Sequence, residues 1–191
     1  MIPDRISSLC LTSTAPRLVN TIGFIENLRN RVNLFIPRPL DQQVANVERN
    51  LYSIDWLKKP DELEYTVKPF PTNADRFAAA EISKRLDPNL YGKKGFMAQA
   101  LAAGWHAKSA EQLKKLGDDV GRGRICVIHG TNDRMITFPH AEILLSELGG
   151  EESGVTKWFL EGQGHVIPIE MRNAFHNKVV EMVEKGRKLN A

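Results

Sequence analysis

The segment from Arg124 to Asp133, RICVIHGTND, is the sequence feature that most constrains the fold. Its four apolar residues, 125–128, lie between a basic residue and a turn-forming cluster, a pattern typical of a short parallel strand buried on both faces. Asp133 follows directly after the carboxyl end of this strand. In open α/β sheets that edge binds ligands and carries catalytic groups, so the segment predicts an α/β fold with a functional carboxylate.

A second strand of the same kind is predicted over 156–160. It breaks into the glycine-rich run EGQGH, which ends at His165. Each of the two units therefore consists of a strand, a turn with one ionisable side chain, and an amphipathic helix. Because parallel strands end at one edge of a sheet, we expect Asp133 and His165 to meet there.

An acid followed by a histidine, each in a loop after a strand, matches the second half of the Ser, Asp, His chain order of α/β-hydrolases. The sequence resembles that superfamily, and its His-Gly-x-x-Asp and Gly-His runs carry the resemblance. The resemblance implies that Asp133 is the triad acid and His165 the triad base. It also implies a partial α/β-hydrolase fold, with about three parallel strands flanked by helices and an inserted helical cap.

The nucleophile of that family is missing. Its Gly-x-Ser-x-Gly elbow precedes the acid in the chain, yet none of the eight serines here has glycine at both positions. Loss of a triad nucleophile lowers turnover by about six orders of magnitude, so we expect the chain alone to be inactive. The first predicted strand, 6–12, looks like the sixth strand of the family. We therefore expect a C-terminal fragment, an internal start at Met1 or a truncated gene model.

The resemblance divides the chain into three parts. Residues 1–16 hold the first core strand and its loop, 17–105 form a helical cap or lid, and 106–191 complete the core. Apolar spacing predicts four helices in the middle part. Their apolar positions are Leu18, Ile22, Ile25, Leu28 and Val32; Val44, Val47 and Leu51; Phe77, Ala78, Ile82 and Leu86; and Phe96, Ala100 and Leu101.

Three further helices are predicted in the last part. Ser109 and Gln112 fit a capping box that begins the first of them. The second, 139–148, follows the acid loop and ends at a pair of glycines. The third, near 169–186, follows the histidine loop and buries an apolar stripe.

Four residues are candidates for a substrate pocket. Met135 follows the acid and Val166 follows the histidine, although plain packing under the loops explains them equally well. Trp105 and His106 lie where the cap rejoins the sheet, and His106 is a minor candidate to face the substrate cavity. Trp56 and Trp105 are also expected to pack inside the cap rather than to form a recognition surface.

The other histidines receive structural interpretations. His129 is expected to bond a nearby backbone group, whereas His140, in the first turn of a helix, and His176 are expected to be exposed. None of them shows metal-ligand spacing with a carboxylate partner, and we predict neither a metal nor another cofactor.

Composition excludes several classes of partner. The net charge is only +3, without a basic run that would indicate nucleic acid binding, and no apolar stretch reaches membrane-spanning length. Cys10 and Cys126 fall in strand-like runs, as expected of reduced, buried thiols. Nothing indicates an oxidising compartment, so the cytoplasm is the default. The compartment, the substrate and the oligomeric state stay open.

Three functions remain at this point. The first is the C-terminal part of a serine hydrolase, esterase-like or lipase-like, whose complete form acts on a small acyl substrate such as an ester or amide. The second is a non-catalytic binding protein that keeps part of the fold and uses the cap as its surface. The third is part of a dehalogenase or epoxide hydrolase, in which an aspartate is the nucleophile.

Overall fold

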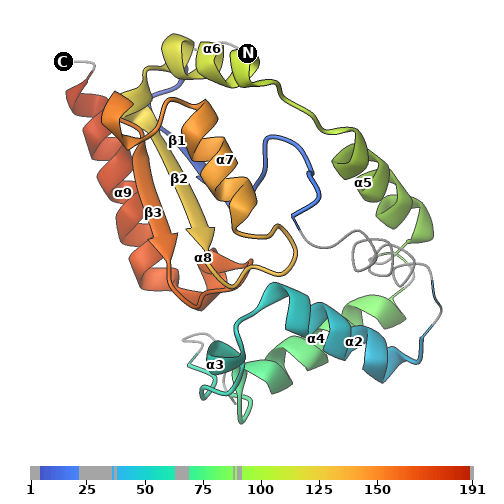
Figure 1. The fold of residues 1–191 in the computed structure, drawn as a ribbon. Coiled ribbons are helices and arrows are strands. Elements are labelled where there is room, and N and C mark those ends of the chain that lie inside the picture. The colour runs from blue at the N-terminus through green and yellow to red at the C-terminus, as the bar shows by residue number, and fades with distance from the viewer. Residues whose placement is uncertain are drawn as a thin grey trace. The chain divides into compact units, whose positions relative to one another are not determined.

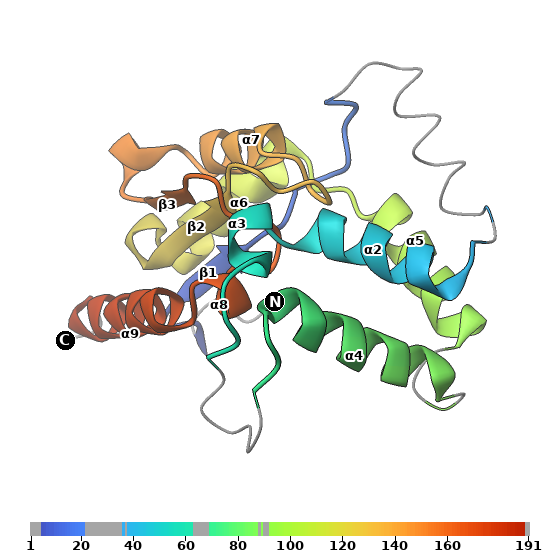
Figure 2. The same ribbon diagram turned by 90° about the horizontal axis from the view of Figure 1, so that it is seen from below.

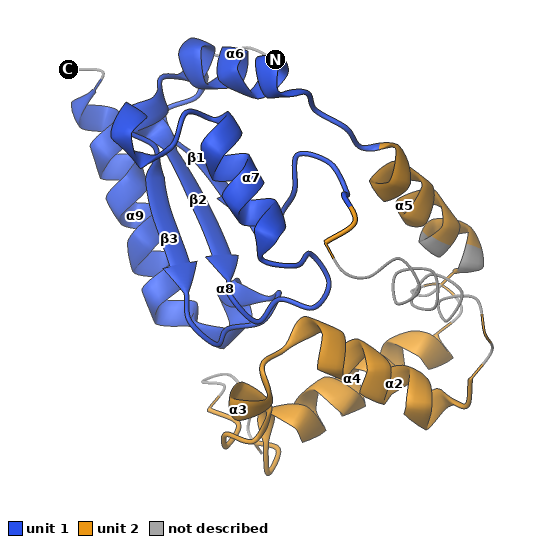
Figure 3. Cartoon of the chain, viewed as in Figure 1, with its two compact units in different colours: residues 1–19, 106–191 blue, residues 20–105 orange. Residues whose placement is uncertain are grey.

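The computed structural model describes residues 5–21, 36, 38–62, 69–87, 89 and 92–189. The chain forms two compact units (Figure 3). The first, called the sheet unit below, contains residues 1–19 and 106–191, and the second, called the helical unit, contains residues 20–105.

The sheet unit is built on three parallel strands in the order β1 (Leu9–Thr12), β2 (Ile125–Gly130) and β3 (Thr156–Leu160), as Figure 1 shows. All six residues of the central strand β2 are buried. A parallel strand buried on both faces explains the continuous apolar run in the sequence. The predicted α/β fold with about three parallel strands is confirmed.

Helices cover both faces of this sheet (Figures 1 and 2). Ile125 and Val127 pack with apolar residues of α6 and α7. Cys126 and Ile128 point to the other face, because side chains alternate along a strand, and they pack with Ile167 and with α9. The sheet-unit helices are α6 (Ala110–Val120), α7 (Pro139–Glu147), α8 (Ile167–Glu170) and α9 (Arg172–Lys188), with short 3₁₀ turns η2 (Arg122–Arg124) and η3 (Glu151–Ser153).

Local sequence signals set most of these boundaries. The predicted capping box is present at α6: Ser109 Oγ accepts the N–H of Gln112 at 3.2 Å, and Gln112 Oε1 accepts the N–H of Ser109 at 3.0 Å. The helix predicted near 169–186 is present as α9, but the break before it was not predicted. Met171 separates α8 from α9 with φ −126° and ψ 42°, outside the helical region.

The helical unit contains α2 (Leu40–Leu51), α3 (Ile54–Leu57), α4 (Asn73–Leu86) and α5 (Lys93–Trp105). Its core holds an aromatic cluster: Tyr52 stacks on Trp56 at 4.7 Å between ring centroids and meets the edge of Phe77 at 5.0 Å. Trp56 is therefore core, as predicted, whereas Trp105 is 81% exposed and the same prediction for it is wrong.

The first predicted helix of the middle part, from Leu18 to Val32, lies mostly outside the described residues. Across the part of the chain that the structure does describe, no helix is both long enough and apolar enough to cross a bilayer.

Candidate active site

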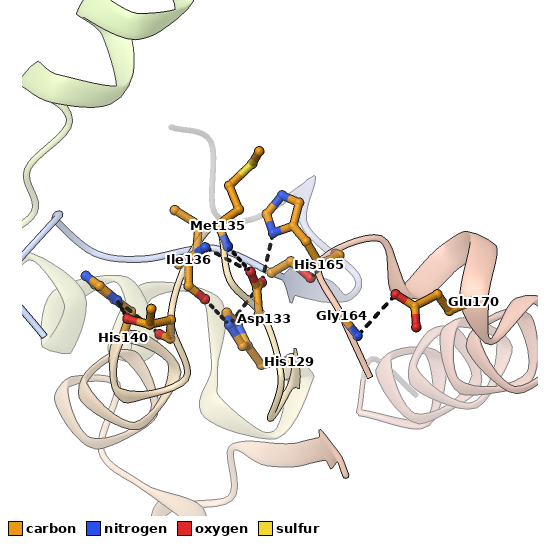
Figure 4. A network of polar contacts seen from close by, with 10 residues as sticks. His129, Asp133, Met135, Ile136, His140, Gly164, His165 and Glu170 are labelled. Atoms are coloured by element: carbon orange, nitrogen blue, oxygen red, sulfur yellow. Dashed lines mark hydrogen bonds and ion pairs between the residues drawn. The ribbon is translucent and has the colours of Figure 1, made fainter. Parts of the chain in front are cut away.

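The side chains of Asp133 and His165 meet at the carboxyl edge of the sheet. His165 Nδ1 lies 2.8 Å from Asp133 Oδ2 (Figure 4). Their loops leave the neighbouring strands β2 and β3, whose parallel pairing brings both exits to one edge. Since a carboxylate only accepts, Nδ1 carries the proton and Nε2 is left as an acceptor. The sequence predicted this meeting, and the structure brings the two groups together.

The carboxylate of Asp133 is held from its own loop as well. Its Oδ1 accepts the backbone N–H groups of Met135 at 2.8 Å and Ile136 at 2.9 Å. Asp133 is only 4% exposed, and buried carboxylate oxygens require such partners. Two backbone donors and one imidazole therefore fix the direction in which the carboxylate faces His165.

The His129 ring also lies close to the Asp133 carboxylate. Its Nε2 lies 2.7 Å from the carbonyl oxygen of Ile136 and 3.3 Å from Asp133 Oδ2. Because a carbonyl only accepts, Nε2 carries the proton, and the predicted bond to a nearby backbone group is present. Burial lowers the pKa of His129 below its ordinary value. Within the described residues its Nδ1 is buried without a hydrogen-bond partner, and this also disfavours a second proton on the ring.

The acid loop and the histidine loop are tied together through their backbones. The N–H of Asn132 donates to the carbonyl of Gln163 at 3.0 Å. A Cβ added to Gly130 would lie 2.2 Å from that same oxygen and 2.5 Å from the carbonyl oxygen of Gly164. Only a glycine at position 130 permits this approach, which explains the residue in the His-Gly-x-x-Asp run.

Two residues that sequence reasoning missed hold the histidine loop. Glu170 is buried in α8, and its Oε1 accepts the N–H of Gly164 at 3.1 Å (Figure 4). Ser13, which follows β1, donates its hydroxyl proton to the carbonyl of His165 at 2.6 Å. Neither the burial of Glu170 nor the separate four-residue helix that carries it could be read from the sequence, so no local signal pointed to this contact.

The prediction that His140 is exposed is wrong. It is 4% exposed, and its Nε2 accepts the N–H of Val19 at 3.1 Å while Nδ1 lies 3.0 Å from the carbonyl of Thr137. The segment around Val19 covers this part of α7, and nothing local to position 140 indicates that cover.

Three of the four pocket candidates belong to the sheet unit and the fourth, Trp105, to the helical unit. Met135 is 51% exposed and serves the acid through its backbone rather than its side chain. Val166 is half-buried where α8 begins. His106 and Trp105 are both exposed, on the sheet unit and the helical unit respectively. Their role in a pocket stays a prediction.

Within the described ranges, no three side chains of His, Cys, Asp or Glu gather closely enough to hold a metal ion. Cys10 and Cys126 are register partners on β1 and β2, and both are free thiols. Burial raises the pKa of the Cys126 thiol to about 12 and that of Cys10 above its ordinary value. The prediction of two buried thiols therefore holds for Cys126, whereas Cys10 is only half-buried.

No model of a known protein family matches this sequence, and no curated protein matches it. Solved structures do match, each at 14% identity. Rv0554 from Mycobacterium tuberculosis covers 94% of this chain with a TM-score of 0.57. A membrane phospholipase A described as a bacterial virulence factor covers 97% with a TM-score of 0.60. The serine hydrolase CarC, involved in carbazole degradation, covers 93% with a TM-score of 0.50.

The chain spans little more than half the length of these proteins, 57% of Rv0554, 51% of the phospholipase and 54% of CarC. The neighbours are α/β-hydrolase proteins. At this low identity the likeness concerns the fold, and it shows that the described residues carry part of the α/β-hydrolase fold.

Proposed function

We propose that this chain, a partial α/β-hydrolase fold, is the C-terminal part of a serine hydrolase that acts on an ester, amide or other acyl substrate. The observation that carries the proposal is the 2.8 Å bond between His165 Nδ1 and Asp133 Oδ2 at the carboxyl edge of the sheet. It leaves Nε2 of His165 free to act as a base. The serine would come from a segment outside these 191 residues.

In this proposal His165 Nε2 takes the proton of the serine hydroxyl as the serine oxygen attacks the acyl carbon. The same nitrogen then returns the proton to the leaving oxygen or nitrogen, so the histidine ends as it began. Asp133 holds Nδ1–H and stabilises the imidazolium formed in between. The buried carboxylate is suited to this role because the N–H groups of Met135 and Ile136 fix its orientation.

Two further observations support the proposal. The similar structures include a serine hydrolase and a phospholipase A, and in each of them close to half of the chain has no counterpart here. The helical unit falls between β1 and β2 in the chain, where an inserted cap would lie. We assign residues 17–105, which include the helical unit, to that cap.

The decisive experiment begins with the reading frame upstream of the Met1 codon. The frame is expressed with these residues and assayed with a short-chain p-nitrophenyl ester and a fluorophosphonate probe. We expect His165→Ala to lower turnover about 10⁶-fold and Asp133→Asn about 10⁴-fold. His176→Ala is the matched control, because this histidine is exposed on α9, and it should leave turnover unchanged.

An open upstream frame without Gly-x-Ser-x-Gly, or a His165→Ala variant that keeps wild-type labelling, would overturn the proposal. The absence of the elbow from these residues favours, as second candidate, a binding protein that has kept the fold. If the protein is such a binding protein, the fluorophosphonate probe should label neither the wild type nor any variant. An aspartate nucleophile of the dehalogenase or epoxide hydrolase kind would instead show turnover of haloalkanes or epoxides without fluorophosphonate labelling.

A further inference from the structure

Ser13 adopts a backbone conformation that serines rarely take. It stands directly after β1 with φ +47°, and among the described residues no other non-glycine residue has a positive φ. The left-handed region is unfavourable for residues with a Cβ. Such strain persists where the surrounding contacts require it, and it often marks a functional site.

The contacts of Ser13 show what the conformation achieves. Its backbone N–H donates to the carbonyl of Ile128 at 2.9 Å, which extends the pairing of β1 with β2 by one residue. Its hydroxyl donates to the carbonyl of His165 at 2.6 Å. One residue therefore joins the end of β1 to the middle strand β2 and to the histidine loop that follows β3.

The position of the His165 ring depends on its backbone, and the backbone is held on both sides. Glu170 accepts the N–H of the preceding residue, Gly164. Ser13 holds the carbonyl of His165 itself. The bonds from Ser13 and to Glu170 hold the backbone around His165. The bond from Nδ1 to Asp133 is then enough to fix the orientation of the ring.

We propose that Ser13 is a positioning residue for His165. Its hydroxyl holds the main chain of the histidine so that Nδ1 stays bonded to Asp133 and Nε2 faces one fixed direction. Because its proton is donated to a backbone carbonyl, Ser13 is assigned no part as a nucleophile. The inference rests on the proposed role of His165 as a base, but its first test needs no catalysis.

The test compares Ser13→Gly with Ser13→Ala in the 191-residue chain labelled with ¹⁵N-histidine. Both variants lose the hydroxyl, but glycine relieves the positive φ whereas alanine keeps it. NMR identifies the protonated ring nitrogen of His165 and measures how fast its proton exchanges with water. In both variants we expect a mixture of tautomers and exchange about tenfold faster, the effect of losing one hydrogen bond.

If Ser13 matters only through its backbone conformation, the expected result is different. In that case Ser13→Gly would keep the wild-type tautomer and exchange rate, and the proposal would be wrong. Should Ser13→Ala fail to fold, Ser13→Gly decides the matter alone. Ser153→Ala is the matched control, because Ser153 Oγ also donates to a backbone carbonyl, that of Gly150 at 2.8 Å, outside the site. It should leave the His165 signals unchanged.

The protein expressed with its upstream frame adds a second readout. Ser13→Gly should lower kcat about tenfold and leave KM unchanged, because the hydroxyl positions the base and does not contact substrate. Fluorophosphonate attached to Ser13 would overturn the inference. An upstream frame without a nucleophile would overturn the proposed function. The NMR comparison would still test the role of Ser13, because it does not depend on catalysis.

Discussion

Both units bury carboxylates, but they partner them differently. In the sheet unit Asp133 and Glu170 are held by backbone N–H groups and a histidine within a mainly apolar core, whereas the helical unit pairs its buried carboxylates with arginines. In the sheet unit Ile125, Ile128 and Leu148 are fully buried against helices on the two faces of the sheet. In the helical unit Asp61 and Glu81 are buried, and each is paired with an arginine.

This difference has a consequence for the site. An apolar, close-packed layer transmits small changes of volume, so the acid and the histidine depend on the fit between loops that leave the same sheet. A buried ion pair contributes little net stability but is costly to break. The sheet unit should therefore respond most to added volume and the helical unit to lost charge.

The largest effect is expected from Gly130→Ala. The added methyl group would lie 2.2 Å from the carbonyl oxygen of Gln163 and 2.5 Å from that of Gly164. Both oxygens belong to the backbone, so neither can move aside as a flexible side chain would. The acid and histidine loops must separate, and we expect a loss of about 3 kcal/mol in the free energy of unfolding, at the upper end for overpacking. Urea denaturation monitored by far-ultraviolet circular dichroism measures the change.

Gly162→Ala is the control for this substitution. It lies in the same histidine loop and has a positive φ of 72°, but a Cβ there meets no atom within 4 Å. Its free energy of unfolding should fall by only about 1 kcal/mol, the cost of placing a residue with a Cβ in the left-handed region. Equal losses in the two variants would show that backbone conformation, not the fit between loops, governs this edge.

In the helical unit we expect the largest loss from Arg76→Met. Asp61 has a fully buried side chain, and Arg76 Nε lies 2.9 Å from its Oδ1. Removing the arginine leaves the buried carboxylate of Asp61 with the hydrogen bond that it accepts from the N–H of Phe70 at 3.1 Å. The expected cost is about 2 kcal/mol, below the usual range for breaking a buried pair because one donor remains.

Hydrogen exchange of the α4 amides checks this loss. Lys115→Met removes an exposed pair with Asp119, at 2.9 Å, and should cost less than about 0.5 kcal/mol. If both substitutions prove equally mild, the helical unit does not depend on its buried charges, and the contrast between the units fails.

A smaller effect is expected from pH, and it belongs to the sheet unit. Burial lowers the pKa of His129 below 6.5, so the unfolded chain binds a proton more readily than the folded one. Its stabilising contribution is complete above pH 6.5 and is lost as the pH falls toward the folded value. His129→Gln keeps a donor for the carbonyl of Ile136 but cannot titrate.

Between pH 7.5 and 5, wild type should therefore lose on the order of 1 kcal/mol more than His129→Gln. Thermal denaturation of both proteins across this range measures the difference. Parallel curves would mean that His129 is not held neutral by the fold.

The smallest effect should be the same in both units. Thr72 begins α4 with a capping box that includes Asp75, and Ser109 begins α6 with one that includes Gln112. We expect Thr72→Ala and Ser109→Ala each to cost about 1 kcal/mol, because the lost bond is local. Unequal losses, measured by hydrogen exchange in each helix, would show that the surrounding core modifies the cap.

Sequence reasoning was most successful where the signal is local. The strands, the capping box at Ser109 and the helix after the acid loop follow from periodicity and turn chemistry. The meeting of Asp133 and His165 followed from a rule of topology, that neighbouring parallel strands end at one edge. The break at Met171 and the exposure of Trp105 were missed, because the apolar pattern around each is equally typical of a continuous or a buried helix.

By itself, then, the sequence determined the kinds of elements, their order and the two side chains that converge at the edge of the sheet. Only the tertiary structure decided how that edge is held. The bond from Ser13 to His165 spans 152 positions and that from Val19 to His140 spans 121. A hydrogen bond between such distant residues leaves no periodic trace in either segment, since each partner alone is an ordinary polar group until the folded chain brings the other to it.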